Sequence, residues 1–125
     1  MADLRTYNKK KNKTAYKILV IDKEGKLRSP FMYMEYTVGE VYHSALKPII
    51  KQLSTFSVLT VEDGLHAYTS RIEAFDHRLA ISEVLRCEEK TVVVKCIIPT
   101  GSKYVVGKDH EIVSDTLQVV KQITL

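Results

Sequence analysis

The run of residues 91–98 (Thr-Val-Val-Val-Lys-Cys-Ile-Ile) constrains the fold of this chain more than any other stretch. Most of its side chains are β-branched, and such side chains favour extended strands over helices. A strand that is apolar on both faces is typical of the buried centre of a sheet. We therefore expect this segment to be the central strand of a β-sheet.

The remaining apolar segments predict a fold that is rich in strands and poor in helices. Period-two patterns and turn residues place further strands at residues 16–22, 31–38, 56–61, 65–69, 104–106, 111–114 and 117–124, with a brief one at 41–43. Strands and helices do not alternate regularly along the chain. The pattern therefore favours an α+β domain with a mostly antiparallel or mixed sheet of about seven strands and one or two helices.

Two segments predict helices. Ser70 and Glu73 fit a capping box, in which each side chain satisfies a free backbone amide at the start of a helix. The apolar residues that follow at helical spacing should form the buried stripe of this helix: Ile72, Phe75 and Leu79, with Ala74 and Ile81 beside them. A second, short helix is expected to start near Lys47, because Pro48 is tolerated only in a first helical turn.

The positive charge of the chain is concentrated at its N-terminus. Of the 19 basic and 15 acidic groups, five and one lie in residues 1–13, which leaves 14 of each sign in residues 14–125. This balanced remainder, a single domain, is not expected to bind nucleic acid or a membrane. Residues 1–13 are interpreted as a flexible basic tail, which either is simply solvated or adds weak affinity for phosphate.

Composition also bears on the cell compartment and on metal binding. The chain has no apolar run near the roughly 20 residues that cross a bilayer and no secretory signal at its start, so a cytoplasmic protein is expected. Cys87 and Cys96 are then expected to be free thiols, with Cys96 buried in its strand. The histidines fall on different predicted elements, which argues against a metal site: His43, His66, His77 and His110.

Residues 63–70 (Asp-Gly-Leu-His-Ala-Tyr-Thr-Ser) are the most promising place for a functional site. A glycine turn, a polar residue on a short strand and a helix cap follow one another there. His66 lies between Leu65 and Ala67 on the predicted strand. It is either a partly buried, hydrogen-bonded histidine or a ligand-binding one.

Three segments carry a resemblance to a known family. They are residues 64–68 (Gly-Leu-His-Ala-Tyr), residues 92–96 (Val-Val-Val-Lys-Cys) and residues 111–115 (Glu-Ile-Val-Ser-Asp), and they span about half of the chain. Their order, with a helix after the first segment, resembles the ADP-ribosyltransferase superfamily and in particular its poly(ADP-ribose) polymerase members. The resemblance implies an ADP-ribosyltransferase-like fold that binds NAD or a related nucleotide.

The resemblance also implies roles for individual residues. Glu111 would be the catalytic glutamate that stabilises a cationic, oxocarbenium-like transition state. His66, or Tyr68 two residues further along the same face, would line the ligand-binding slot. Residues 16–22 contain no histidine to match the one on the family's first core strand, so the resemblance leaves catalysis open. The alternative for Glu111 is a plain charge at a strand edge beside His110.

A second resemblance covers most of the chain but implies no activity. Gly25-x-Leu-Arg-Ser-Pro, Gly64-x-His-Ala and Cys96-x-Ile-Pro-x-Gly-x-x-Tyr look like motifs of small uncharacterised bacteriophage and prophage proteins. The similarity implies a non-enzymatic role in phage–host interaction, such as blocking a bacterial defence component by binding a protein or a nucleotide signal. The residues that either contact such a partner or pack in the core are Tyr33, Tyr36 and Tyr42.

Overall fold

The structure, a computed structural model, describes residues 3–6, 11–30, 32–53, 56–85, 90–107 and 110–124. Strand β9 (Lys90–Ile98) lies at the centre of the main sheet, between β2 (Lys13–Ile21) and β12 (Thr116–Ile123). The pairing of β2 with β9 is antiparallel and runs without a break from Lys13 to Ile21. The central strand predicted from the β-branched run is confirmed.

The main sheet has ten strands in the described part of the chain, and all of its pairings are antiparallel. Its order is β1-β10-β11-β8-β2-β9-β12-β5, with β3 beside β2 and β4 beside β3. The other strands of this sheet are β1 (Asp3–Thr6), β3 (Leu27–Arg28), β4 (Glu35–Tyr36), β5 (Val41–His43), β8 (Leu65–Tyr68), β10 (Lys103–Val106) and β11 (Glu111–Ser114). The predicted α+β class is confirmed. The strands outnumber the prediction because elements such as β3, with two residues, are too short to leave a sequence pattern.

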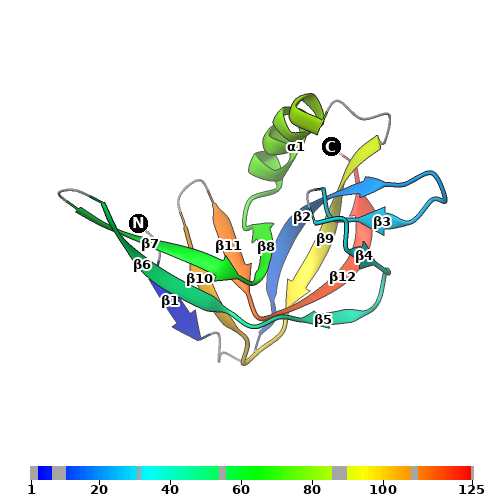
Figure 1. Cartoon of the computed structure of the whole chain (residues 1–125). Coiled ribbons are helices and arrows are strands. Elements are labelled where there is room, and N and C mark those ends of the chain that lie inside the picture. Colours follow the sequence, from blue (N-terminus) through cyan, green and yellow to red (C-terminus); the bar gives the residue numbers. More distant parts are fainter. Residues whose placement is uncertain are drawn as a thin grey trace.

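The sheet curls around one apolar core and carries a second one on its other face (Figure 1). Side chains alternate between the two faces along each strand. The larger core takes Leu19 from β2 and Val94 from β9, and Tyr36 and Tyr42 cover it. The smaller core takes Ile18 and Val93 from the same two strands and packs against the helix.

Helix α1 (Arg71–Leu85) covers β2, β8 and β9. The amide of Glu73 donates a hydrogen bond to Oγ of Ser70 at 3.4 Å, which confirms the Ser70 half of the predicted capping box. The carboxylate of Glu73 lies 3.8 Å from Nδ1 of His77. The predicted buried stripe is wrong in part, because the helix is rotated about its axis relative to the prediction. Ala74 and Phe75 are buried, whereas Ile72 is 67% exposed and Leu79 58% exposed.

The second predicted helix is absent, and this part of the prediction is wrong. The segment is instead strand β6 (Lys47–Leu53), which forms a two-stranded sheet with β7 (Phe56–Asp63). Ile49 and Ile50 are β-branched and suit a strand, and a partner strand follows after a short connection. Pro48 lies beside a shift in the strand register, which is where a residue without an N–H donor is tolerated in a sheet.

The strand predicted at residues 31–38 is also wrong in extent. Strand β4 has two residues, and Tyr36 is buried there, whereas Met34 and Val38, which alternate with it along the chain, are exposed. Met32 is 87% exposed, and Tyr33 has a positive φ of 57° that takes the chain out of the extended conformation. Phe31 lies outside the described residues.

Two further predictions concern the ends of the strands and the thiols. Within the predicted basic tail, Asp3–Thr6 forms β1, which pairs with β10, and Lys13 is the first residue of β2. The predicted boundary at residue 13 therefore does not coincide with the edge of the sheet. Cys96 is a free thiol in the larger core, as predicted, and Cys87 lies outside the described residues.

Candidate functional site

The candidate site lies where two neighbouring strands separate. β2 pairs with β8 at a single position, Tyr16 opposite Tyr68. Continuing this register would place Ile18 opposite His66, but the two strands are no longer paired there. The backbone carbonyl of His66 instead accepts a hydrogen bond from Nζ of Lys17 at 2.7 Å. A side chain thus satisfies a carbonyl that would otherwise lack its sheet partner.

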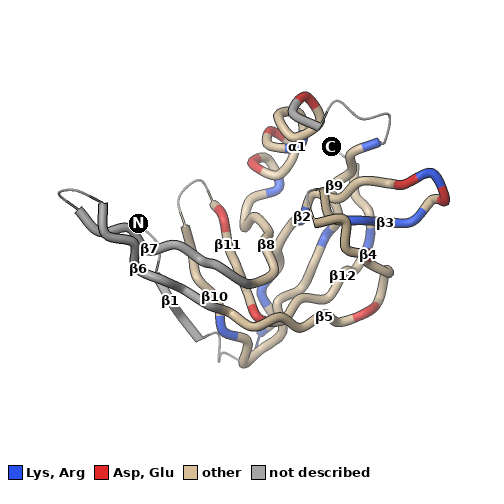
Figure 2. The backbone as a smooth tube through the Cα atoms, viewed as in Figure 1, with Lys and Arg blue, Asp and Glu red and all other residues tan. Residues whose placement is uncertain are grey.

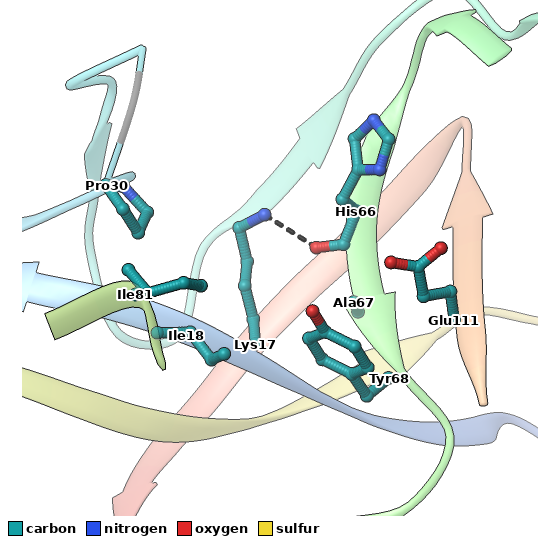
Figure 3. Close-up of a pocket in the computed structure, with 8 residues that line it drawn as sticks. All are labelled: Lys17, Ile18, Pro30, His66, Ala67, Tyr68, Ile81 and Glu111. Carbon is teal, nitrogen blue, oxygen red and sulfur yellow. Dashed lines mark hydrogen bonds between the residues drawn. The ribbon is translucent and has the colours of Figure 1, made fainter. Parts of the chain in front are cut away.

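A cavity of about 300 Å³ opens at this split (Figure 3). Eight residues line it, four of them apolar and four carrying polar, titratable groups: Lys17, Ile18, Pro30, His66, Ala67, Tyr68, Ile81 and Glu111. A few convergent polar groups against apolar walls are typical of small-molecule sites. The volume is at the lower end of the range for such sites, so it suits a ligand no larger than about one mononucleotide.

Lys17 is the most unusual residue in this cavity. It is 7% exposed, and its Nζ lies 5.3 Å from the centre of the Tyr36 ring. Among the described residues it forms no ion pair with a carboxylate. Burial disfavours the charged amine and lowers the pKa of Lys17 to about 8. An unpaired buried lysine is costly to keep, which makes it a marker of function.

His66 and Tyr68 lie on the same face of β8 and both contribute to the cavity. The pKa of His66 is lowered, first by the partial burial of the imidazole ring and then by the nearby charge of Lys17. The charge of Glu111 acts in the opposite direction and raises this pKa. Burial, followed by the charges of Glu111 and Glu73, raises the pKa of Tyr68. At neutral pH the cavity therefore contains a neutral imidazole and a protonated phenol.

The helix fixes the orientation of Tyr68. Its ring stacks on the ring of His77, with the ring centres 4.8 Å apart and the planes inclined by 26°. His77 Nδ1 in turn lies 2.8 Å from the backbone carbonyl oxygen of Glu73, one helical turn earlier. Stacking on one side leaves the hydroxyl edge of Tyr68 directed into the cavity (Figure 3).

Glu111 stands at the first position of β11, directly opposite Tyr68 on β8. Neighbouring side chains at paired positions share one face of a sheet. Its carboxylate is exposed and points toward β8 in Figure 3. Glu111 is thus an exposed charge at a strand end that also lines the cavity.

The wall formed by Pro30 depends on an ion cluster at the turn between β2 and β3. Nε of Arg28 donates a hydrogen bond to Oδ2 of Asp22 at 2.7 Å, and this contact, the largest of several causes, lowers the pKa of the Asp22 carboxyl. Figure 2 shows charged residues of both signs gathered at this turn. Ser29 and Met34 close the next loop through hydrogen bonds of 2.8 and 2.9 Å, and Pro30 lies inside it.

All three residues predicted as a site line the same cavity: His66, Tyr68 and Glu111. Lys17 was not predicted, although a signal for it exists in the sequence. It lies between Ala15 and Leu19 on the face of its strand that turns to the core, where a lysine is out of place. Pro30 and Ile81 were not predicted as site residues either, because they reach the cavity from distant segments.

The tyrosines proposed as partner contacts fall into two groups. Tyr36 is buried in the larger core, and Tyr42 is half-buried against it with the two ring centres 4.7 Å apart. These two therefore serve core packing. Tyr33 is exposed beside Met32 and Met34, and its ring lies 5.0 Å from the guanidinium of Arg28.

Comparisons of the chain with protein-family models, with curated proteins and with solved structures find no match. In the described part of the chain, no helix is long and apolar enough to cross a membrane. Among these same residues, no group of three or more His, Cys, Asp or Glu side chains is arranged to hold a metal ion.

Proposed function

We propose that the cavity binds a nucleotide, either a mononucleotide or one nucleotide half of NAD. The observation that supports this most is the convergence of a buried cation, Lys17, with the three residues predicted from sequence. An ammonium group has three N–H donors, and the carbonyl of His66 takes one of them. The remaining donors can bind the phosphate of a nucleotide.

The negative charge of Glu111 in the same cavity suits the ribose of a nucleotide. Glu111 is an acceptor of hydrogen bonds, and the two hydroxyls of a ribose are donors that a carboxylate binds well. Pro30 and Ile81 supply an apolar wall against which a base can lie. A cation and an anion in one small cavity are complementary to a ligand that carries a phosphate and a diol.

Lys17 also bears on whether the cavity catalyses ADP-ribosyl transfer. The transition state of that reaction carries positive charge on the ribose, and the Lys17 ammonium would repel it. The geometry therefore supports binding rather than transfer. The proposed relation to ADP-ribosyltransferases and the proposed phage origin concern ancestry and do not change this conclusion about the cavity.

Thermal unfolding in the presence of adenosine monophosphate, adenosine and NAD tests the proposal. A ligand present at ten times its Kd adds about 1.4 kcal/mol to the free energy of unfolding, which raises Tm by a few degrees. We expect adenosine monophosphate to stabilise the protein more than adenosine does, because only the former has a phosphate for Lys17. No stabilisation by any of the three at millimolar concentration would refute the proposal.

Two variants assign the contacts. Lys17→Met should abolish the difference between the nucleotide and the nucleoside, since it removes the cation. Glu111→Gln should weaken binding of both by about tenfold, since it weakens acceptance of the ribose hydroxyls. Glu83→Gln, an exposed carboxylate on α1 outside the cavity, is the matched control and should bind as the unchanged protein does.

The exposed loop of Met32, Tyr33 and Met34 favours a second function, the non-enzymatic binding of a host protein. Exposed methionine and tyrosine are enriched at protein–protein contacts. The double variant Met32→Ser, Met34→Ser should abolish capture of a bacterial partner and leave nucleotide binding intact. Equal capture by the variant and the unchanged protein would exclude this loop as the contact.

A further inference from the structure

The amine of Lys17 has the surroundings of a nucleophile rather than those of a structural cation. Its nearest acceptor is the neutral carbonyl of His66 at 2.7 Å, and in the described part of the chain no carboxylate forms an ion pair with it. Residues from three segments form the apolar part of the cavity wall, namely Ile18, Pro30 and Ile81, with Ala67 beside them. Desolvation of this kind activates a lysine amine toward carbonyl compounds.

The hydrogen bond to His66 also orients the amine. A neutral amine keeps two N–H groups and one lone pair. If one N–H remains on the His66 carbonyl, the lone pair and the second N–H are left for a ligand in the cavity. The Tyr36 ring, 5.3 Å from Nζ, closes the side of the amine that faces the larger core.

A proton donor lies in the same cavity. The Tyr68 hydroxyl points toward the region of the Lys17–His66 hydrogen bond, and the Glu111 carboxylate points toward β8 from the side of β11 (Figure 3). The raised pKa of Tyr68 keeps its hydroxyl protonated across the neutral and mildly basic range. A phenol in this position can protonate an oxygen that develops negative charge and can help it leave as water.

We propose that Lys17 forms an imine with small aldehydes that enter this cavity. The nitrogen lone pair attacks the carbonyl carbon to form a C–N bond, and the π electrons of the carbonyl move to oxygen, which takes a proton from Tyr68. The nitrogen then returns a proton to the Tyr68 phenolate, and Tyr68 passes it to the new hydroxyl, which leaves as water while the nitrogen lone pair forms the C=N bond. The Tyr68 phenolate recovers from solvent the proton that the Lys17 ammonium released when it became the neutral amine. One aldehyde and one lysine ammonium thus give one protonated imine and one water.

The acidity of the amine is consistent with this chemistry. With a pKa of about 8, roughly a quarter of the Lys17 side chains are neutral at pH 7.5, against about a thousandth for an ordinary lysine. The titratable groups around the amine are His66, Tyr68 and Glu111 on the cavity side and Tyr36 and Cys96 on the core side. Burial raises the pKa of both Tyr36 and Cys96 to about 12, so neither of them changes charge near pH 8.

Reductive trapping with glycolaldehyde and sodium borohydride tests the proposal on the full chain. Borohydride supplies the hydride that converts an imine to a stable secondary amine, so each trapped lysine gains one hydroxyethyl group. Peptide mass spectrometry after a short reaction at pH 7.5 should find Lys17 modified at least tenfold more than Lys13, which lies four residues earlier on the same strand. The yield at Lys17 should reach half of its maximum near pH 8.

Three variants complete the test. Lys17→Met, which keeps the volume and removes the charge, should lose the modification at this site while it stays folded. Lys13→Arg, the matched control, should keep the modification of Lys17 unchanged. Tyr68→Phe should slow trapping by about tenfold or more if the hydroxyl is the proton donor, and should leave the half-maximal pH near 8.

Two outcomes of the trapping experiment would refute the proposal. If Lys17 is modified no faster than Lys13 at pH 7.5, or if its half-maximal pH lies near that of exposed lysines, the proposal is refuted. This outcome would not touch nucleotide binding, which is measured by thermal shift and needs only the protonated amine. A positive trapping result without any nucleotide stabilisation would conversely establish the imine chemistry and refute the nucleotide proposal.

Discussion

Strand β2 has two neighbours, and the contrast between them explains where the candidate site lies. On one side, β9 pairs with β2 over its whole length, and both strands contribute buried apolar side chains to the two cores. On the other side, β8 pairs with β2 at one position, and a lysine and a cavity occupy the space beyond it. The complete ladder gives this sheet its stability. The interrupted ladder exposes backbone and side-chain polar groups to a ligand.

The largest expected change in the free energy of unfolding comes from the side of β2 that pairs fully with β9. Ile98→Ala should lower the free energy of unfolding by about 3 kcal/mol, since Ile98 is completely buried where β9 pairs with the start of β2. The same change at Ile81, in the cavity wall and half-buried, should cost about 1 kcal/mol. Urea unfolding of both variants measures the contrast, and equal losses would contradict it.

A substitution of Gly64 tests the packing between β8 and β11, on the side of β8 away from β2. A Cβ at this position would overlap Cγ1 of Val113 on β11, and φ is 151°. Gly64→Ala should therefore cost about 2 kcal/mol through overlap and backbone strain together. Gly101→Ala has the strain, with φ of 89°, but open space around the added carbon, and should cost about 1 kcal/mol. Thermal unfolding of the two variants separates overlap from strain.

Lys17→Met should act in the opposite direction and stabilise the protein by about 2 kcal/mol at pH 7. Because burial lowers its pKa to about 8, from 10.5, the folded state loses the Lys17 proton before the unfolded state does. The loss of stability that comes from burying the charged amine is therefore complete below pH 8, and it is relieved as the pH rises from 8 to 10.5. The advantage of the variant, measured by urea unfolding at each pH, should disappear over that range. A difference that does not vary with pH would show that Lys17 is not a buried charge.

The smallest change in the free energy of unfolding is expected when the hydroxyl of Tyr68 is removed, at the single position where β2 pairs with β8. Tyr68→Phe keeps the ring stacked on His77 and should change the free energy of unfolding by about 0.5 kcal/mol or less, because the hydroxyl faces the cavity. Its effect should appear instead in the trapping rate of Lys17. Tyr16→Phe, across the strand pair, is the control and should leave that rate unchanged.

Parts of this fold and site were predictable because their signals are local. The β-branched run predicted the central strand, and Ser70 with Glu73 predicted the helix start, since both depend on neighbours in sequence. The helix predicted near Lys47 failed because pairing with β7 outweighed the spacing of its apolar residues. The buried stripe of α1 was misplaced because the sheet, rather than the helix, decides which side is covered.

The sequence alone predicted a mostly antiparallel or mixed sheet with a capped helix, and it marked His66, Tyr68 and Glu111 as candidate site residues. Only the tertiary structure placed these three around one cavity and added Lys17 to them. The physical reason is that a strand pattern specifies which face each side chain takes, but not where two strands separate. The separation of β2 from β8 leaves a carbonyl unpaired, and a buried lysine satisfies it.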